Sequence, residues 1–179
     1  MFGVPVMGTH AHSWIMSFSS ELEAFRAYAR QYPNNLILLA DTYNTLKQGV
    51  PDAITIFKEM KAAGTLPKAY GIRLDSGDLA YLSKEAHKMF VEAGFPDAII
   101  AASNDLDENL ISELKAQGCV INSWGVGTNL ITAKDSPSLG GVFKLVGQYD
   151  DGKFVPKIKM SDNVEKISNP GLKNVLRIY

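Results

Sequence analysis

Four short apolar runs, each followed by polar residues, recur along the chain about one βα unit apart, and this repeat constrains the fold most. They predict strands at residues 36–40, 69–73, 97–102 and 119–123. Continuous apolar runs are typical of strands that are covered on both faces. Helical patterns lie between them, so the alternation predicts a parallel sheet, in either an open doubly wound form or a β/α barrel.

The helices are predicted from their capping residues and apolar spacing. Ser20 and Glu23 form a capping box, and Pro51 suits the first turn of the next helix. Glycines at positions 64, 94 and 118 suit helix C-termini. We therefore expect helices starting near residues 20, 51, 78 and 107.

After Thr128 the pattern changes to antiparallel β structure. We expect a strand at residues 142–146, a hairpin turn at 150–152, a strand at 153–159 and another turn at 169–171. The predicted organisation is therefore a β/α portion at residues 1–135, which carries the polar motifs, and a β-rich extension at residues 136–179.

Composition excludes several classes of function. The formal net charge of −1 gives no electrostatic reason to expect nucleic acid or an anionic membrane as a partner. No apolar run approaches the roughly 18 residues of a membrane span, and no secretory leader is visible, so we expect a cytoplasmic protein. The single cysteine, Cys119, is expected to be a small buried hydrophobic residue. Because the chain opens inside a polar motif, we also expect it to be a fragment that lacks an N-terminal part.

Polar residues at the carboxyl ends of the predicted strands form the candidate site, since α/β folds build their sites at that edge. Arg73 could clamp a carboxylate or phosphate, and Asp75 could hold ribose hydroxyls. The glycine-rich turn at Gly125, Gly127 and Thr128 could bind a phosphate through backbone N–H groups. Together they suggest a phosphorylated sugar as ligand, although an Arg–Asp ion pair, a helix cap and a plain turn explain them equally well.

Two histidines and several short polar side chains leave alternatives open. His10 and His12 could bind a metal, form structural hydrogen bonds, or act as a nucleophile or acid–base group. Asp41 is either a site residue or the cap of a turn. Ser103 and Asn104 could grip a sugar hydroxyl, whereas the aspartates that follow them suit a helix cap.

Taken together, the motifs resemble the nicotinate phosphoribosyltransferase family of type II phosphoribosyltransferases. Its motifs occur in the family's order at residues 8–13, 41–45, 71–79, 102–107 and 124–128, and tail segments at 139–145 and 169–173 are also similar. The resemblance covers essentially the whole chain. It implies an irregular, TIM-like β/α barrel with a β-rich domain built from the terminal parts.

The resemblance also implies an activity and roles for the site residues. Nicotinate and 5-phosphoribosyl 1-diphosphate would give nicotinate mononucleotide and diphosphate, with Mg²⁺, as a salvage step of NAD biosynthesis. ATP hydrolysis would be coupled through a phosphohistidine at His12, while His10 occupies a variable position. The substrate-binding residues would be Thr9 and Arg73 for nicotinate, Ser103 and Asn104 beside the ribose, and Gly127 and Thr128 for the 5-phosphate, with Gly125 in the same glycine-rich turn. Asp75 would contact the ribose, and Asp75 or Asp41 would stabilise positive charge on it; no residue is assigned as a direct metal ligand.

The family's full-length proteins are expected to be homodimers, in which the N-terminal part supplies an aromatic residue that stacks on nicotinate. Two other interpretations stay open, namely a non-catalytic barrel fragment and a nicotinamide-specific phosphoribosyltransferase. A sugar-phosphate aldolase is disfavoured because it needs a Schiff-base lysine at a strand end. Lys68 precedes its strand, and Lys144 lies in the tail.

Overall fold

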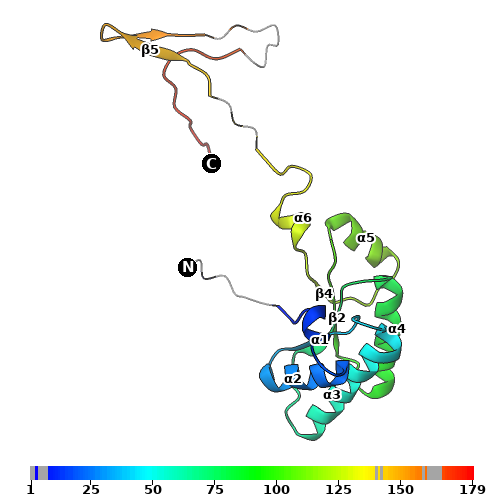
Figure 1. The fold of residues 1–179 in the computed structure, drawn as a ribbon. Helices are drawn as coiled ribbons and strands as arrows, with labels where there is room; N and C mark the ends of the chain where they lie inside the picture. Colours follow the sequence, from blue (N-terminus) through cyan, green and yellow to red (C-terminus); the bar gives the residue numbers. More distant parts are fainter. Residues whose placement is uncertain (1–2, 4–7, 140, 142, 159, 161–166) are drawn as a thin grey trace. The chain divides into compact units, whose positions relative to one another are not determined.

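The structure is a computed structural model that describes the chain except residues 1–2, 4–7, 140, 142, 159 and 161–166. The chain divides into two compact units, Met1–Asp135 and Ser136–Tyr179. Figure 1 shows the helices and the larger sheet of unit 1, and the β5 strand of unit 2.

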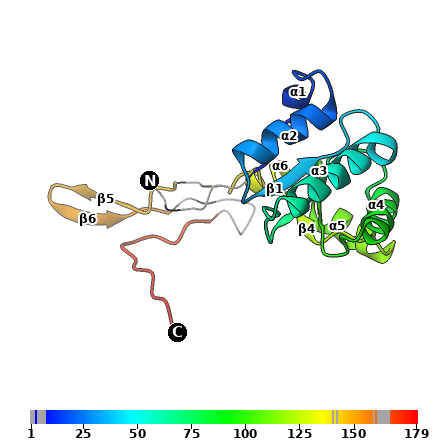
Figure 2. The same ribbon diagram turned by 90° about the horizontal axis from the view of Figure 1, so that it is seen from below.

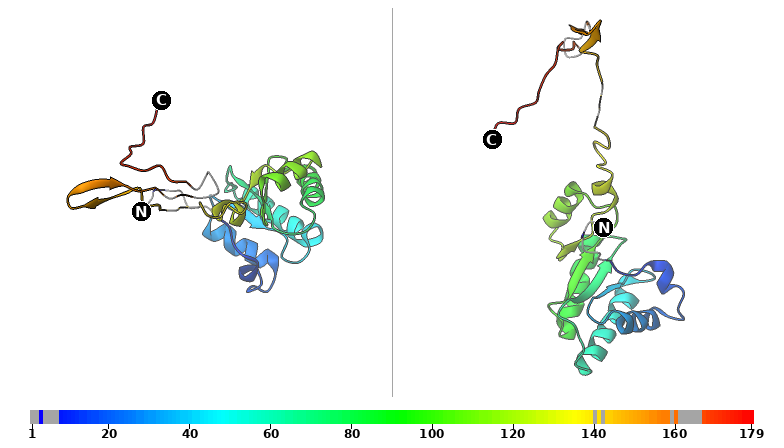
Figure 3. Two further views of the ribbon diagram at one scale, coloured as in Figure 1. Left: turned by 90° about the horizontal axis from the view of Figure 1, so that it is seen from above. Right: turned by 90° about the vertical axis from the view of Figure 1, so that its left-hand side faces the viewer.

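The core of unit 1 is a four-stranded sheet in the order β1-β2-β3-β4, with every neighbouring pair parallel. Its strands are β1 (Leu36–Leu39), β2 (Tyr70–Leu74), β3 (Ile99–Ala102) and β4 (Ser123–Trp124). The right-hand view of Figure 3 shows these strands side by side. The predicted parallel α/β arrangement is confirmed, whereas the described strands form an open sheet and not a closed barrel.

Helices connect consecutive strands. Unit 1 contains α1 (His12–Ile15), α2 (Glu21–Gln31), the π-helix η1 (Thr45–Gly49), α3 (Val50–Ala62), α4 (Leu79–Ala93), α5 (Glu108–Ala116) and α6 (Thr128–Ile131). Figure 2 shows β1 beside α2 and α3. The predicted capping box is present, because Ser20 Oγ accepts the Glu23 N–H at 3.2 Å. Gly94 ends α4 with φ +85°, a left-handed conformation that glycine adopts without steric cost.

The two faces of the sheet differ in burial. Alternate residues such as Leu38, Ile72 and Ile100 are fully buried against the helices. The side chains between them, including Arg73 and Ala101, lie on the other face and are only partly buried. This face is apolar at Ile37, Ile99 and Ala101 and carries one cation, Arg73.

Two sequence expectations in this unit are wrong. The last strand is predicted at 119–123, but β4 covers only two residues. Its pairing is interrupted because the side chain of Asn122, instead of a backbone carbonyl, accepts the Ile100 N–H at 3.0 Å. Cys119 precedes this strand and is half-buried at the edge of the core rather than fully enclosed.

Unit 2 contains one hairpin, in which β5 (Gly147–Asp150) pairs antiparallel with β6 (Lys153–Pro156). The turn at 150–152 is as predicted, and Asp151 and Gly152 both have positive φ, which matches the right-handed twist of the strands. The first strand follows residues 142–146 instead of occupying them, and residues 142 and 159 lie outside the described part. None of the described helices is long and apolar enough to cross a bilayer.

Candidate functional site

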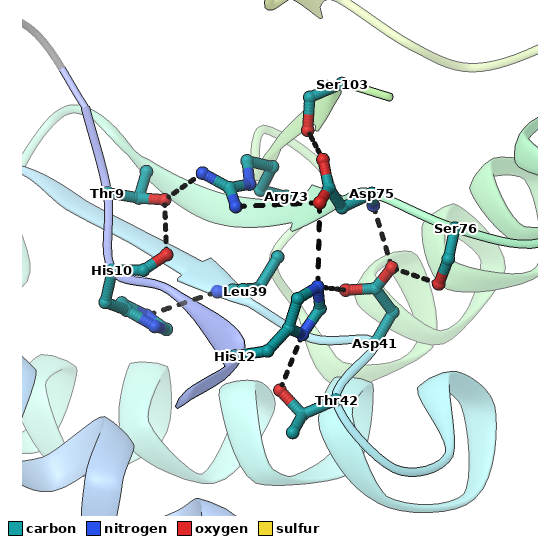
Figure 4. Close-up of polar contacts among 10 residues, drawn as sticks. All are labelled: Thr9, His10, His12, Leu39, Asp41, Thr42, Arg73, Asp75, Ser76 and Ser103. Carbon is teal, nitrogen blue, oxygen red and sulfur yellow. Dashed lines mark hydrogen bonds and ion pairs between the residues drawn. The ribbon is translucent and has the colours of Figure 1, made fainter. Parts of the chain in front are cut away.

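Polar side chains from three neighbouring strands meet at the carboxyl edge of the sheet (Figure 4). Asp41 follows β1, Asp75 follows β2, and Ser103 follows β3. Parallel strands bring these positions to one edge even though they are far apart in sequence. Thr9 lies in the segment before α1, and His12 is the first residue of that helix (Figure 4). Residues from four of the predicted motifs therefore form one cluster.

Asp41 connects two loops of the cluster from a buried position. Its side chain is 1% exposed. Its Oδ2 accepts the backbone N–H of Asp75 at 2.8 Å and the hydroxyl of Ser76 at 2.5 Å. Its Oδ1 is buried and has no hydrogen-bond partner among the described residues. Asp41 therefore fixes the loop after β2 and keeps one carboxylate oxygen free, so it does more than cap its own turn.

His12 is the partly exposed member of the cluster, with 37% of its side chain accessible. Its Nδ1 lies 3.2 Å from Thr42 Oγ1. Its Nε2 lies 3.6 Å from Asp75 Oδ2 and 3.8 Å from Asp41 Oδ1. In the tautomer with its proton on Nε2, that N–H faces the two carboxylates, and the lone pair of Nδ1 accepts the hydroxyl of Thr42.

Arg73 lies on the partly exposed face of the sheet and points its guanidinium toward Thr9 and Asp75. Its Nη1 donates to Thr9 Oγ1 at 2.7 Å, and its Nη2 is 4.0 Å from Asp75 Oδ2. Its Nε is buried without a hydrogen-bond partner in the described part of the chain. A cavity of about 620 Å³ opens beside Arg73 and is also lined by Thr9, Ser103, Ser123 and Trp124. The guanidinium thus retains the capacity to bind an anion in this cavity.

Ser103 donates its hydroxyl to Asp75 Oδ1 and fixes that carboxylate from the side of β3. Gly125 lies next to Ser103, and its N–H donates to Ala102 O at 2.8 Å. Asn104 is exposed and has φ +91°. These three positions therefore line the same edge as the aspartates.

Gly127 and Thr128 are exposed at the start of α6. A Cβ built on Gly127 would meet nothing within 4 Å. The structure does not join these two residues to the His12 cluster by a side-chain contact in the part that it describes. Their predicted phosphate role therefore depends on their place in the loop after β4.

His10 is a structural residue, one of the three roles that its sequence allows. It is 8% exposed, and its Nε2 accepts the backbone N–H of Leu39 at 3.2 Å. The ring packs against Trp14 and edge-on against Tyr28. Burial, with smaller contributions from Arg73 and His12, lowers the pKa of His10 to about 4. A neutral, enclosed imidazole that already accepts a backbone hydrogen bond is not available for acid–base work.

Sequence reasoning missed two partners in the cluster. Thr42 contacts His12, and Ser76 contacts Asp41, yet neither was selected as a site residue. Both are neighbours of predicted site residues, and that was the one signal available. Within the described residues, no group of three or more histidine, cysteine, aspartate or glutamate side chains could hold a metal ion.

Fold and site together define a class, an α/β domain with an arginine, two aspartates and a histidine at the carboxyl edge of a parallel sheet. Residues 1–168 match the model of the nicotinate phosphoribosyltransferase (NAPRTase) family. The chain therefore belongs to this family, as its motifs predict.

Individual relatives agree with that assignment. The chain is 54% identical over 177 residues to the nicotinate phosphoribosyltransferase of Bacillus subtilis, covering 99% of this chain and 35% of the relative. It is 39% identical to the Dictyostelium discoideum enzyme of that name, covering 99% of this chain and 37% of the relative. The chain thus spans about a third of the length of these curated relatives.

Solved structures give the same result for the fold. The crystal structure of human nicotinic acid phosphoribosyltransferase matches with a TM-score of 0.63 and 26% identity, over 69% of this chain and 35% of that one. A nicotinate-nucleotide pyrophosphorylase from Pyrococcus furiosus matches with a TM-score of 0.55 at 23% identity, which bears on the fold alone.

Proposed function

We propose that this chain forms part of the active site of a nicotinate phosphoribosyltransferase. The reaction transfers the phosphoribosyl group of 5-phosphoribosyl 1-diphosphate to nicotinate, giving nicotinate mononucleotide and diphosphate for NAD biosynthesis. The observation that supports the proposal most is that Arg73, Asp75, Asp41 and His12 meet at the carboxyl edge of the sheet (Figure 4). Arg73 also lines the cavity on the partly exposed face of the sheet. The names of the relatives support the same substrate.

Arg73 is proposed to bind the carboxylate of nicotinate. A guanidinium pairs with a carboxylate through two parallel hydrogen bonds, which a neutral amide cannot match. The hydrogen bond that the guanidinium donates to Thr9 Oγ1 fixes its orientation beside the cavity. This arrangement favours nicotinate over nicotinamide, the substrate of the alternative enzyme.

Asp75 is proposed to stabilise the ribose during transfer. Breaking the bond between C1 and the diphosphate develops positive charge on the sugar, and a carboxylate beside it lowers the barrier. The hydrogen bond from Ser103 to the Asp75 carboxylate and the one from the Asp75 N–H to Asp41, here called the Asp41 clamp, fix Asp75 before substrate binds. Asp75 therefore needs little reorganisation during the reaction. Asn104 is proposed to contact a ribose hydroxyl from the neighbouring loop.

His12 is proposed to carry the phosphoryl group that couples ATP hydrolysis to transfer. Its Nδ1 lone pair would attack the γ-phosphorus of ATP, forming an N–P bond as the bond to ADP breaks. The proton on Nε2 stays in place, and the resulting positive ring is stabilised by Asp41 and Asp75, which lie 3.8 and 3.6 Å away. The phosphohistidine then adds negative charge beside the ribose site.

The loop after β4 is proposed to bind the 5-phosphate through Gly125, Gly127 and Thr128. Glycines allow close approach of backbone N–H groups to an anion. Since the described residues do not build a metal site on their own, we derive no step through a protein-held ion. Mg²⁺ is proposed to arrive with the diphosphate, where it neutralises the leaving group.

The complete protein is proposed to close the sheet into an irregular β/α barrel. The partly buried face of the sheet, on which Ile37, Ile99 and Ala101 line the cavity, would be the inner face of such a barrel. A homodimer and a cytoplasmic location remain proposals for that complete protein. The isolated chain presents the same inner face uncovered, which favours the second candidate, a fragment that is inactive by itself.

The test measures nicotinate mononucleotide formed from nicotinate, 5-phosphoribosyl 1-diphosphate, ATP and Mg²⁺. It uses residues 1–179 and, separately, the product of the complete open reading frame that encodes them, with nicotinamide as the competing substrate. We expect the protein encoded by the complete open reading frame to form nicotinate mononucleotide from nicotinate. Product from nicotinamide alone would replace the proposal with the alternative enzyme, and absence of product from either substrate would reject it.

A further inference from the structure

Asn129 connects the last short helix of unit 1 to the loop after β3. Its Nδ2 donates to Asp105 O at 2.7 Å and to Leu106 O at 3.1 Å. Both N–H groups of the carboxamide are therefore used on one loop. The proposed reaction assigns no role to this side chain, although it follows Thr128 directly.

The loop that Asn129 holds has an unusual backbone. Asn104 and Asp105 are consecutive non-glycine residues with φ of +91° and +47°. Such left-handed conformations persist where the surrounding structure holds them in place. Leu106 anchors the far end of the loop in the core, with 1% of its surface exposed. The two hydrogen bonds from Asn129 hold the carbonyl groups beside that anchor.

The conformation of this loop matters for the site on both of its sides. Ser103 precedes the left-handed residues and donates to the carboxylate of Asp75. Gly125 lies against Ser103, so the glycine-rich turn also packs on this loop. A change in the loop backbone would therefore displace Ser103 and Asn104, and with them the support of Asp75.

We propose that Asn129 is a positioning residue for the phosphoribosyl substrate. Its carboxamide holds the loop at 104–105 in the left-handed conformation and thereby keeps Ser103 and Asn104 at the sugar. The predicted effect of Asn129 on substrate binding rests on the proposed function. The predicted effect of Asn129 on the conformation of the loop does not.

The matched substitutions are Asn129→Asp and Thr132→Ala, made in the complete open reading frame that encodes this chain. Asn129→Asp preserves the shape of the side chain but replaces both donors with an oxygen that repels the two carbonyls. Thr132 is the control because it lies on the next turn and its hydroxyl donates only to Thr128 O among the described residues. If the Asn129→Asp protein does not fold, Asn129→Ala is used in its place.

The first measurement is amide hydrogen exchange. We expect exchange at residues 103–106 to become at least tenfold faster in Asn129→Asp, with β2 unchanged and with Thr132→Ala equal to the parent. Unchanged exchange in the loop would overturn the proposal. This measurement needs no catalytic activity, so it stays informative even if the parent protein makes no nicotinate mononucleotide, which would reject the proposed function instead.

The second measurement is steady-state kinetics. In Asn129→Asp we expect the KM for 5-phosphoribosyl 1-diphosphate to rise five- to tenfold and kcat to fall, because Asp75 loses the support of Ser103. The KM for nicotinate should stay within twofold of the parent. Adding Asp105→Gly, which adopts positive φ without steric cost, is expected to recover part of the KM. A loop that exchanges faster while all kinetic constants stay unchanged would also overturn the positioning role.

Discussion

The carboxylate of Asp41 accepts the backbone N–H of Asp75 at 2.8 Å and so fixes the segment after β2 from the end of β1. The same oxygen, Oδ2, accepts the hydroxyl of Ser76. The other oxygen, Oδ1, faces His12 Nε2 at 3.8 Å. One buried side chain therefore combines a structural task on one oxygen with an electrostatic task on the other.

Substitutions of Asp41 separate these two tasks. Asp41→Ala removes both hydrogen bonds and leaves the part-buried N–H of Asp75 without this partner, so we expect the free energy of unfolding to fall by about 2 kcal/mol. Asp41→Asn retains an oxygen at the clamp, and we expect a loss of about 1 kcal/mol. Both variants lack the charge beside His12 and should be phosphorylated at least tenfold more slowly. Urea unfolding and phosphate incorporation measure the two effects.

Ser76→Ala is the control for the clamp alone, because it removes one hydrogen bond to Asp41 and preserves the charge. We expect a loss of about 1 kcal/mol with phosphorylation of His12 within twofold. Equal losses of stability in Asp41→Ala and Asp41→Asn would contradict the assignment of the structural hydrogen bonds to Oδ2 and of the electrostatic effect on His12 to Oδ1.

Arg73→Lys tests the recognition of nicotinate. Lysine retains the positive charge but cannot form two parallel hydrogen bonds with a carboxylate, so we expect the KM for nicotinate to rise about tenfold or more. Thr9→Val removes the hydrogen bond that orients Arg73 and should raise the same KM less, about three- to fivefold. Initial rates at varied nicotinate give both values. A larger effect on the KM for 5-phosphoribosyl 1-diphosphate would place Arg73 at the sugar instead.

His10 should make the protein lose stability in acid. Burial holds its folded-state pKa at about 4, below its ordinary 6.5, so the unfolded chain takes up the proton first as pH falls. The stability is present above about pH 6.5 and is lost between there and pH 4, by about 3 kcal/mol in total. Urea unfolding across this window should show the slope in the parent and lose it in His10→Gln.

Glu21 should act in the opposite direction. It is fully buried, and burial, with smaller contributions from Asp52 and Asp41, raises its pKa to about 7 from its ordinary 4.5. The folded state keeps the proton to higher pH, so its contribution is present below about pH 4.5 and is lost as pH rises through 7. Allowing for screening, the loss is about 2 kcal/mol. Glu21→Gln should be more stable than the parent at pH 8, and equal stability there would contradict the raised pKa.

Gly71→Ala tests the packing of the sheet beneath the site. A Cβ at Gly71 would lie 1.9 Å from the carbonyl oxygen of Ile99, so β2 and β3 would have to separate. We expect a loss above about 3 kcal/mol in urea unfolding. Gly127→Ala is the control, since its Cβ would meet nothing within 4 Å and its stability should stay within about 0.5 kcal/mol of the parent.

Local patterns predicted elements of both units where the signal was also local. The Ser20 capping box, the first three strands and the hairpin turn before β6 all depend on neighbouring residues, and the structure has them. The shortening of β4 depends on Asn122 competing for a backbone N–H of another strand. A contact between residues so far apart in sequence leaves no periodicity from which it could be predicted.

The site could be predicted as a set of residues but not as a set of contacts. Strand ends placed Asp41, Asp75 and Ser103 at one edge, because parallel strands bring their carboxyl ends together. Which histidine is enclosed and which is accessible depends on the aromatic residues of α1 and α2 that pack around His10. The clamp by Asp41 similarly depends on the spacing between strands.

The most direct test of the account is the phosphorylation of His12. The complete open reading frame product would be incubated with ATP and Mg²⁺ and examined by intact mass and peptide mapping under alkaline conditions, beside His12→Ala and His10→Gln. We predict one acid-labile phosphate on His12, present in His10→Gln and absent in His12→Ala, with faster formation of nicotinate mononucleotide when ATP is added. Phosphate that persists in His12→Ala, or nicotinate mononucleotide formation that ATP leaves unchanged in the parent, would contradict it.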